Sequence, residues 1–178
     1  MTFWLPFFPN DLTKLISKGF KPTGDIVYYK QKNNRLCTYF AASTCIAYNV
    51  GIKMTQDEVL ELWKEHTIAN GKQTALKLAE RHWLTAYEVD IKDWLRRGSQ
   101  WAISVSLSVP PEFYLDGQDG KVDKDYDKKL GVGHQVCLYR KGKRIIAINS
   151  WWKQEIDITD QILNMIKNKS ISTWIIIA

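Results

Sequence analysis

Four side chains that can do acyl-transfer chemistry together occur in one order along the sequence: Gln31, Cys37, His134 and Asn149. A thiol attacks a carbonyl carbon as the thiolate, and an imidazole within hydrogen-bond reach takes its proton and later gives it to the leaving group. An asparagine amide can hold that imidazole in one tautomer, and a glutamine amide can donate to the oxyanion of the tetrahedral intermediate. Each residue alone has an ordinary structural interpretation, such as a core thiol or a turn asparagine. Together, and in this order, they indicate a cysteine nucleophile.

The context of the four residues is specific: Gln31 stands six residues before Cys37, and Phe40-Ala41-Ala42-Ser43 follows the thiol. Asn149-Ser150-Trp151 follows His134 at a distance of fifteen residues. This pattern resembles that of the papain-like cysteine peptidases and covers about residues 31–152. The resemblance implies that Cys37 is the nucleophile and His134 the base. It also implies that Asn149 orients the histidine and that Gln31 donates to the oxyanion.

The sequence departs from the family pattern at several points. Asn34 stands where the family has a second cysteine, and Thr38 stands where it usually has tryptophan. The glycine that precedes the nucleophile in the family is missing. A separation of 97 residues between Cys37 and His134 is also shorter than the roughly 130 usual in papain-like enzymes. The chain therefore resembles a compact, divergent relative, and no substrate preference follows from the resemblance.

The resemblance implies a cysteine endopeptidase that hydrolyses a peptide or protein substrate through a thioester acyl-enzyme. Two alternatives stay open at this point. One is a catalytically silent papain-like binding module, which the departures at Asn34 and Thr38 favour slightly. The other is a Cys-His-Asn amidase or acyltransferase, because acyl-enzyme chemistry does not fix the acceptor.

Length and composition predict an ordinary globular protein. A chain of 178 residues can bury one core, and 45% hydrophobic with 25% charged residues is typical of a folded domain. The net charge of +6 is spread along the chain apart from the basic run at 140–144, which we interpret as a solvated hairpin turn. We therefore expect no nucleic-acid partner. No apolar run approaches the ~18 residues of a membrane span, so we expect no membrane partner either.

The three cysteines cannot form a paired disulfide framework, and we interpret Cys45 and Cys137 as buried free thiols. Such thiols indicate a reducing compartment, and residues 1–9 lack the basic start of a signal peptide, so we expect a cytoplasmic location. His66 and His82 lie on expected helices without metal-ligand spacing. We therefore expect neither a metal nor another cofactor, and the sequence does not indicate an oligomeric state.

Helical periodicity dominates the first half of the chain and strand alternation the second, which predicts an α+β fold. The expected helices are 11–18, 37–48, 55–66, 74–83 and 91–97, and the expected strands are 27–30, 101–108, 134–140, 144–149 and 173–177. By resemblance, residues 1–178 form one papain-like domain with two lobes. The helical lobe, about 1–98, would hold the nucleophile, and the antiparallel β lobe, about 99–178, would hold the histidine and the asparagine. The active site would lie in the cleft between the lobes.

Local geometry is expected to support the chemistry. A helix that begins at Cys37, together with a neighbouring imidazolium, would lower the pKa of the thiol. A hairpin centred near Gly142 would place His134 opposite residue 150 and make Asn149 an immediate neighbour.

Four further residues are candidates for substrate binding: Trp151, Trp101, Gly133 and Gly71. Trp151 follows the asparagine and would cover the His–Asn bond from water. The strand that begins at Trp101 and the segment 132–133 carry no charged group, which predicts an apolar pocket and a preference for a bulky apolar substrate side chain. The polar loop 110–131 would form the rim of the cleft.

Overall fold

The structure, a computed structural model, describes residues 15, 19–31, 36–66, 71–109, 132–150, 155–168 and 174–178. Within these ranges three helices come first and an antiparallel sheet follows, so the predicted α+β class is confirmed. Among the described residues, none of the helices combines the length and the apolar character that crossing a bilayer would require.

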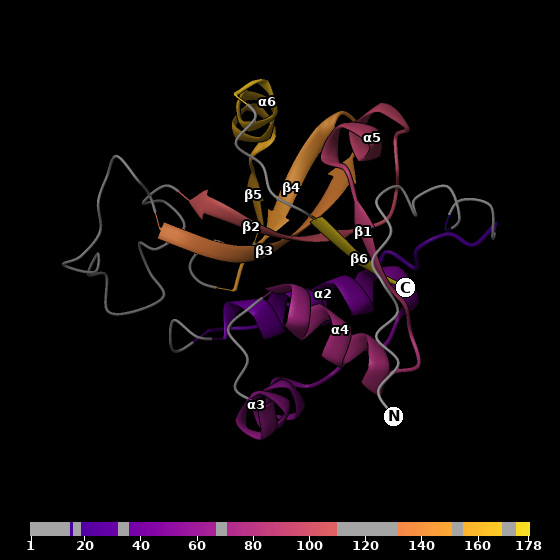
Figure 1. The fold of residues 1–178 in the computed structure, drawn as a ribbon, viewed down its shortest axis with the longest axis vertical. Helices are drawn as coiled ribbons and strands as arrows, with labels where there is room; N and C mark the ends of the chain where they lie inside the picture. The colour runs from indigo at the N-terminus through magenta and orange to yellow at the C-terminus, as the bar shows by residue number, and fades with distance from the viewer. Residues whose placement is uncertain are drawn as a thin grey trace.

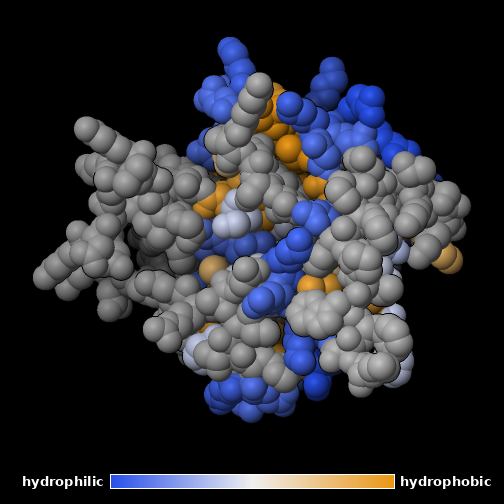
Figure 2. All heavy atoms as spheres, viewed as in Figure 1, coloured by the Kyte–Doolittle hydropathy of each residue, from blue (hydrophilic) through white to orange (hydrophobic). Residues whose placement is uncertain are grey.

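Helices α2 (Cys37–Val50), α3 (Gln56–His66) and α4 (Gly71–Arg81) form a helical layer. Helix α2 is rich in alanine and other apolar residues and is buried on nearly all sides, as a central helix must be. It ends at Gly51, whose φ of 77° is the left-handed conformation that glycine adopts easily. Helix α3 begins with the predicted capping box, in which Thr55 and Glu58 each accept a hydrogen bond from the other's backbone N–H. The outer surface of α3 is hydrophilic (Figure 2).

The sheet contains six strands within the described residues: β1 (Ala86–Val89), β2 (Ile103–Val109), β3 (Val132–Lys141), β4 (Arg144–Ile148), β5 (Glu155–Asp157) and β6 (Trp174–Ile177). Their order is β1-β6-β2-β3-β4-β5, and every neighbouring pair is antiparallel. The last strand in sequence thus lies inside the sheet, between β1 and β2 (Figure 1).

The two faces of the sheet are covered by different helices. Helices α2 and α4 lie along one face, and α5 (Ile91–Arg96) and α6 (Thr159–Lys167) lie on the other (Figure 1). Strand β3 alternates accordingly: Val136 and Leu138 belong to the core that includes residues of α5 and α6, whereas Cys137 and Tyr139 pack in the cluster that includes a residue of α2. Each face of the sheet is therefore a core surface, and α2 packs directly against the strand that carries His134.

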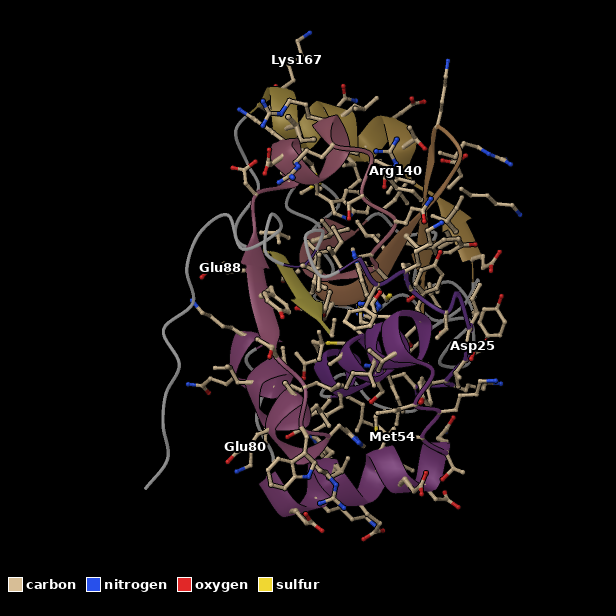
Figure 3. All side chains as sticks on the ribbon, turned by 90° about the vertical axis from the view of Figure 1, so that its right-hand side faces the viewer. Asp25, Met54, Glu80, Glu88, Arg140 and Lys167 are labelled. Atoms are coloured by element: carbon tan, nitrogen blue, oxygen red, sulfur yellow. The ribbon has the colours of Figure 1, made fainter. Side chains whose placement is uncertain are left out.

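Polar side chains join the elements at both faces. The Asn49 amide of α2 donates to the carbonyl oxygens of Ala102 and Ile177 at 3.0 and 3.1 Å and accepts from the Ala102 N–H at 2.8 Å. On the other face, Arg140 of β3, which is labelled in Figure 3, donates to the Leu95 carbonyl at 2.8 Å, and its guanidinium lies over the Trp94 ring. These bonds hold α2 and α5 to the sheet that lies between them.

Several predicted elements differ from the structure. Residues 27–30 form no strand, although Tyr29 is buried and its hydroxyl donates to the Met54 carbonyl at 2.8 Å. Strands β1 and β5 and helix α6 were not predicted from the sequence. Because β1 and α5 already pack with the sheet, the boundary expected near residue 98 does not separate helices from strands. The predicted helix 11–18 and loop 110–131 lie largely or wholly outside the described residues.

Candidate active site

Cys37 is the first residue of α2, as the sequence predicts. The helix begins after Leu36, whose carbonyl accepts from the Phe40 N–H at 3.0 Å. The thiol is partly exposed, and burial raises its pKa above the ordinary value, while the nearby backbone N–H groups of Gln135, Thr38 and Cys37 itself act to lower the pKa. Two of those donors belong to the helix N-terminus, and the third belongs to β3. The sulfur therefore lies at the contact between α2 and the residue that follows His134.

His134 and Asn149 are brought together by the β3–β4 hairpin. Cys137 pairs with Ile148, and the strands are joined by a two-residue turn that includes Gly142. This register is one residue from the predicted one. Leu138 pairs with Ala147, and by alternation along each strand His134 and Asn149 lie on the same face of the hairpin as this pair. In the predicted register the asparagine would have pointed to the other face.

The His134 ring contacts Asn149 through one nitrogen: His134 Nε2 lies 2.7 Å from Asn149 Oδ1, and both residues are about 1% exposed. An amide oxygen only accepts hydrogen bonds, so Nε2 carries the proton in this assignment. In the neutral ring, Nδ1 then holds the lone pair, and this atom is buried. The asparagine thus fixes the tautomer in which Nδ1 is the basic nitrogen.

Burial lowers the pKa of His134 to about 4, against a smaller opposite effect of the hydrogen bond to Asn149. With the pKa of Cys37 raised by burial, both groups are uncharged at pH 7 in this structure. The low thiol pKa predicted from the helix start is therefore not what the structure gives. The helix N–H groups act in the predicted direction, but desolvation at the contact with β3 outweighs them.

Gln31 is fully buried and is held by Ser150. The Ser150 hydroxyl donates to Gln31 Oε1 at 2.7 Å, and the Gln31 N–H donates to the Ser150 carbonyl at the same distance. Because the amide oxygen is occupied by the hydroxyl, the amide NH₂ is the end that can donate to another group.

Three contacts connect all four predicted chemical residues. Gln31 is hydrogen-bonded to Ser150, and the residue before Ser150, Asn149, is hydrogen-bonded to His134. The residue after His134, Gln135, has its backbone N–H beside the Cys37 sulfur. The contact between Gln31 and Ser150 joins residues that are 119 apart in sequence. The segments that carry the four residues are thus connected through their chain neighbours.

The candidate substrate-binding residues are placed differently from one another. Trp101 is 5% exposed and packs in the core beside α5, where its carbonyl accepts from Trp94 Nε1, so it does not face the cluster. Gly133 lies in β3 opposite Ser108, one residue before His134. Trp151 lies outside the described residues.

Gly71 does lie beside the cluster. A Cβ on this first residue of α4 would meet the Gln135 amide oxygen at 2.5 Å. The same amide donates from Nε2 to Ser104 Oγ at 2.9 Å. Gly71 therefore makes the space that the Gln135 side chain fills.

The predicted apolar pocket is not found along β2. Ile103 and Val105 are buried in the core beside α5 and α6, because alternate strand residues share a face. Ser104 and Ser106 occupy the opposite face, together with Gln135. The side of β2 that faces α2 is thus polar, because the apolar side chains of this strand point toward α5 and α6.

Gln135, Ser150 and Ser104 are site residues that the sequence did not indicate. Ser150 had a signal, since it stands between the predicted asparagine and Trp151, but Gln135 and Ser104 had none beyond their positions in strands. Among the described residues, His, Cys, Asp and Glu side chains form no group of three that could hold a metal ion. No protein-family model matches the chain, and no curated protein sequence matches it.

Proposed function

We propose that this chain is a papain-like cysteine peptidase that cleaves peptide bonds through Cys37 and His134. The observation that carries the proposal is the buried contact of His134 Nε2 with Asn149 Oδ1 at 2.7 Å, on the strand whose next residue, Gln135, has its backbone N–H beside the Cys37 sulfur. Nucleophilic catalysis by a thiol requires a base that can reach the sulfur and a group that orients the base, and the contact between His134 and Asn149 supports the second of these. The fold is proposed to have the two-lobed arrangement, with α2, α3 and α4 in one lobe and the sheet in the other.

In the proposed reaction, His134 Nδ1 takes the proton of Cys37 as the sulfur attacks the substrate carbonyl carbon. The backbone N–H of Cys37 and the NH₂ group of Gln31 donate to the oxyanion that forms. The imidazolium then gives its proton to the leaving amine, which leaves a thioester on Cys37. Water attacks the thioester with His134 again as base, and the carboxylic acid product and the free thiol are released.

Asn149 supports this cycle through the tautomer of His134. Its amide oxygen accepts a hydrogen bond from the Nε2–H group both in the neutral ring and in the imidazolium. The ring therefore keeps its orientation in both states. Truncation of Asn149 should therefore lower turnover without abolishing it, because the proton acceptor itself remains.

A second candidate function, a papain-like module that binds a peptide without turnover, is favoured by one observation. Burial raises the pKa of Cys37 and lowers that of His134 to about 4, so the resting pair is uncharged at pH 7. An enzyme with this pair must transfer the proton during attack, whereas a binding module has no need of the transfer.

Hydrolysis of a mixed peptide library at pH 7 tests the proposal, with products followed by mass spectrometry. Cleavage by the wild type that is lost in Cys37→Ala and His134→Ala supports the peptidase. Cys45→Ala and His82→Ala are the matched controls, since they remove the same side-chain types away from the cluster, and both should retain activity. Cleavage that survives Cys37→Ala would overturn the proposal. If no peptide is cleaved although Cys37 reacts with an epoxysuccinyl probe, an amidase or acyltransferase is favoured.

A further inference from the structure

Two cysteines that the proposed reaction does not use face one another between α2 and β3. Cys45 lies in α2, eight residues after Cys37, and Cys137 lies in β3, three residues after His134. Their sulfur atoms are 3.0 Å apart, and both residues are completely buried. Both are free thiols in the structure, as the sequence interpretation had them. The separation is shorter than the sum of two sulfur van der Waals radii. The two sulfur atoms would therefore need to move only a short distance to form a disulfide bond.

The surroundings of the pair are apolar and keep the thiols unreactive once the protein is folded. Ala102, Ile146 and Ile148 pack in the same cluster. Burial raises the pKa of Cys45 well above the ordinary value, and the contact with Cys137 raises it further. Thiol–disulfide exchange requires a thiolate and access to the sulfur, and this site provides neither.

We propose that Cys45 and Cys137 form a buried disulfide under oxidising conditions and that this bond joins α2 to β3 in the native fold. The oxidant is a small-molecule disulfide such as oxidised glutathione. The two thiols lose two electrons and two protons and form one S–S bond, and the glutathione disulfide takes up both and becomes two glutathione thiols. The reaction proceeds through a mixed disulfide, so it occurs while the chain is folding and the sulfurs are still accessible.

The bond would connect the helix that begins with the proposed nucleophile to the strand that carries the proposed base. It would close a loop of 92 residues, and loops of this length give a large loss of chain entropy in the unfolded state. For a protein of this size the corresponding rise in Tm is on the order of 10 °C. Once buried, the bond should resist dithiothreitol until the protein unfolds.

The test uses Cys37→Ala, in which Cys45 and Cys137 are the two remaining cysteines. The variant is refolded from urea in a mixture of oxidised and reduced glutathione, then denatured and treated with N-ethylmaleimide. Intact mass, a peptide map without reductant and Tm are measured, and a parallel sample is refolded in dithiothreitol. Cys37→Ala combined with Cys137→Ala is the matched control that cannot form the bond within the chain.

The expected result is a linked pair of peptides containing residues 45 and 137, no N-ethylmaleimide on either, and a Tm about 10 °C above that of the reduced sample. Two alkylated thiols after oxidative refolding would overturn the proposal. A bond that forms but lowers Tm would also overturn it, because the link would then not fit the native fold. None of these readouts depends on catalysis, so the inference stands or fails separately from the proposed peptidase.

Discussion

The uncharged, buried state of His134 predicts that acid destabilises the protein through this one side chain. In the folded protein its pKa is lowered to about 4, from an ordinary value of 6.5. Between these two pH values the imidazole of His134 binds a proton in the unfolded chain but not in the folded chain. The free energy of unfolding that this side chain contributes above pH 6.5 is therefore lost as the pH falls toward 4. A non-titrating replacement such as His134→Gln removes this dependence and keeps an amide donor for Asn149.

The magnitude follows from the pKa difference. Relative to pH 7, the wild type should lose about 2 kcal/mol of unfolding free energy at pH 5 and about 3 kcal/mol at pH 4, beyond whatever His134→Gln loses. Carboxylates that titrate in the same range are common to both proteins and cancel in the difference. The constant cost of the substitution also cancels, because only the change with pH is compared.

The assay is urea unfolding followed by tryptophan fluorescence at several pH values from 7 to 4, with stabilities obtained by linear extrapolation. His82→Gln is the matched control: burial lowers the pKa of His82 as well, but the residue is only partly buried, so its effect should be much smaller. Parallel curves for wild type and His134→Gln would refute the reasoning. A wild type that gains stability on acidification would show instead that His134 is charged in the fold, as it would be beside a Cys37 thiolate.

Three further predictions concern Gln31, Gly71 and Asn49. Gln31→Ala should lower kcat by roughly 10²–10³ with a smaller change in KM, as measured by steady-state kinetics on a cleaved peptide; a pure KM effect would make Gln31 a substrate-binding residue. Gly71→Ala should cost about 1 kcal/mol in urea unfolding because its Cβ displaces the Gln135 amide, 2.5 Å away. That cost should vanish in a Gln135→Ala background, and an equal cost in both would place the strain elsewhere. Asn49→Ala should destabilise by about 2–3 kcal/mol, because it leaves two buried carbonyls and one N–H without their partner; a loss below 0.5 kcal/mol would contradict this role.

The sequence predicted best those features that short-range rules decide. The start of α2 at Cys37, the capping box of Thr55 and the turn near Gly142 all follow from local residue preferences, and the structure has each of them. Helix α6 could have been found in the same way, since Ile162 and Ile166 stand at helical spacing after Thr159. Strand β1 could not, because four residues become a strand only when β6 pairs with them.

The chemistry of the site depended on contacts that sequence patterns do not contain. The hairpin predicted that His134 and Asn149 are neighbours, and their side chains are in contact. The ionisation of the pair was not predictable, because the burial of His134 is set by how β3 packs rather than by its neighbours in sequence. The pocket was mispredicted for the same reason, since alternation in β2 identifies two faces but not which one the core takes.

The most direct test of the proposed nucleophile and base is the rate at which each cysteine of the folded, reduced protein reacts with iodoacetamide at pH 7, followed by peptide mass spectrometry. Cys37 should be modified first, since it is partly exposed and nearby backbone N–H groups favour its thiolate, whereas Cys45 and Cys137 are completely buried. In His134→Ala the rate at Cys37 should fall by roughly 10²-fold, because the base that takes its proton is gone. Modification of Cys45 or Cys137 before Cys37, or an unchanged rate in His134→Ala, would contradict the assignment of Cys37 and His134 as nucleophile and base.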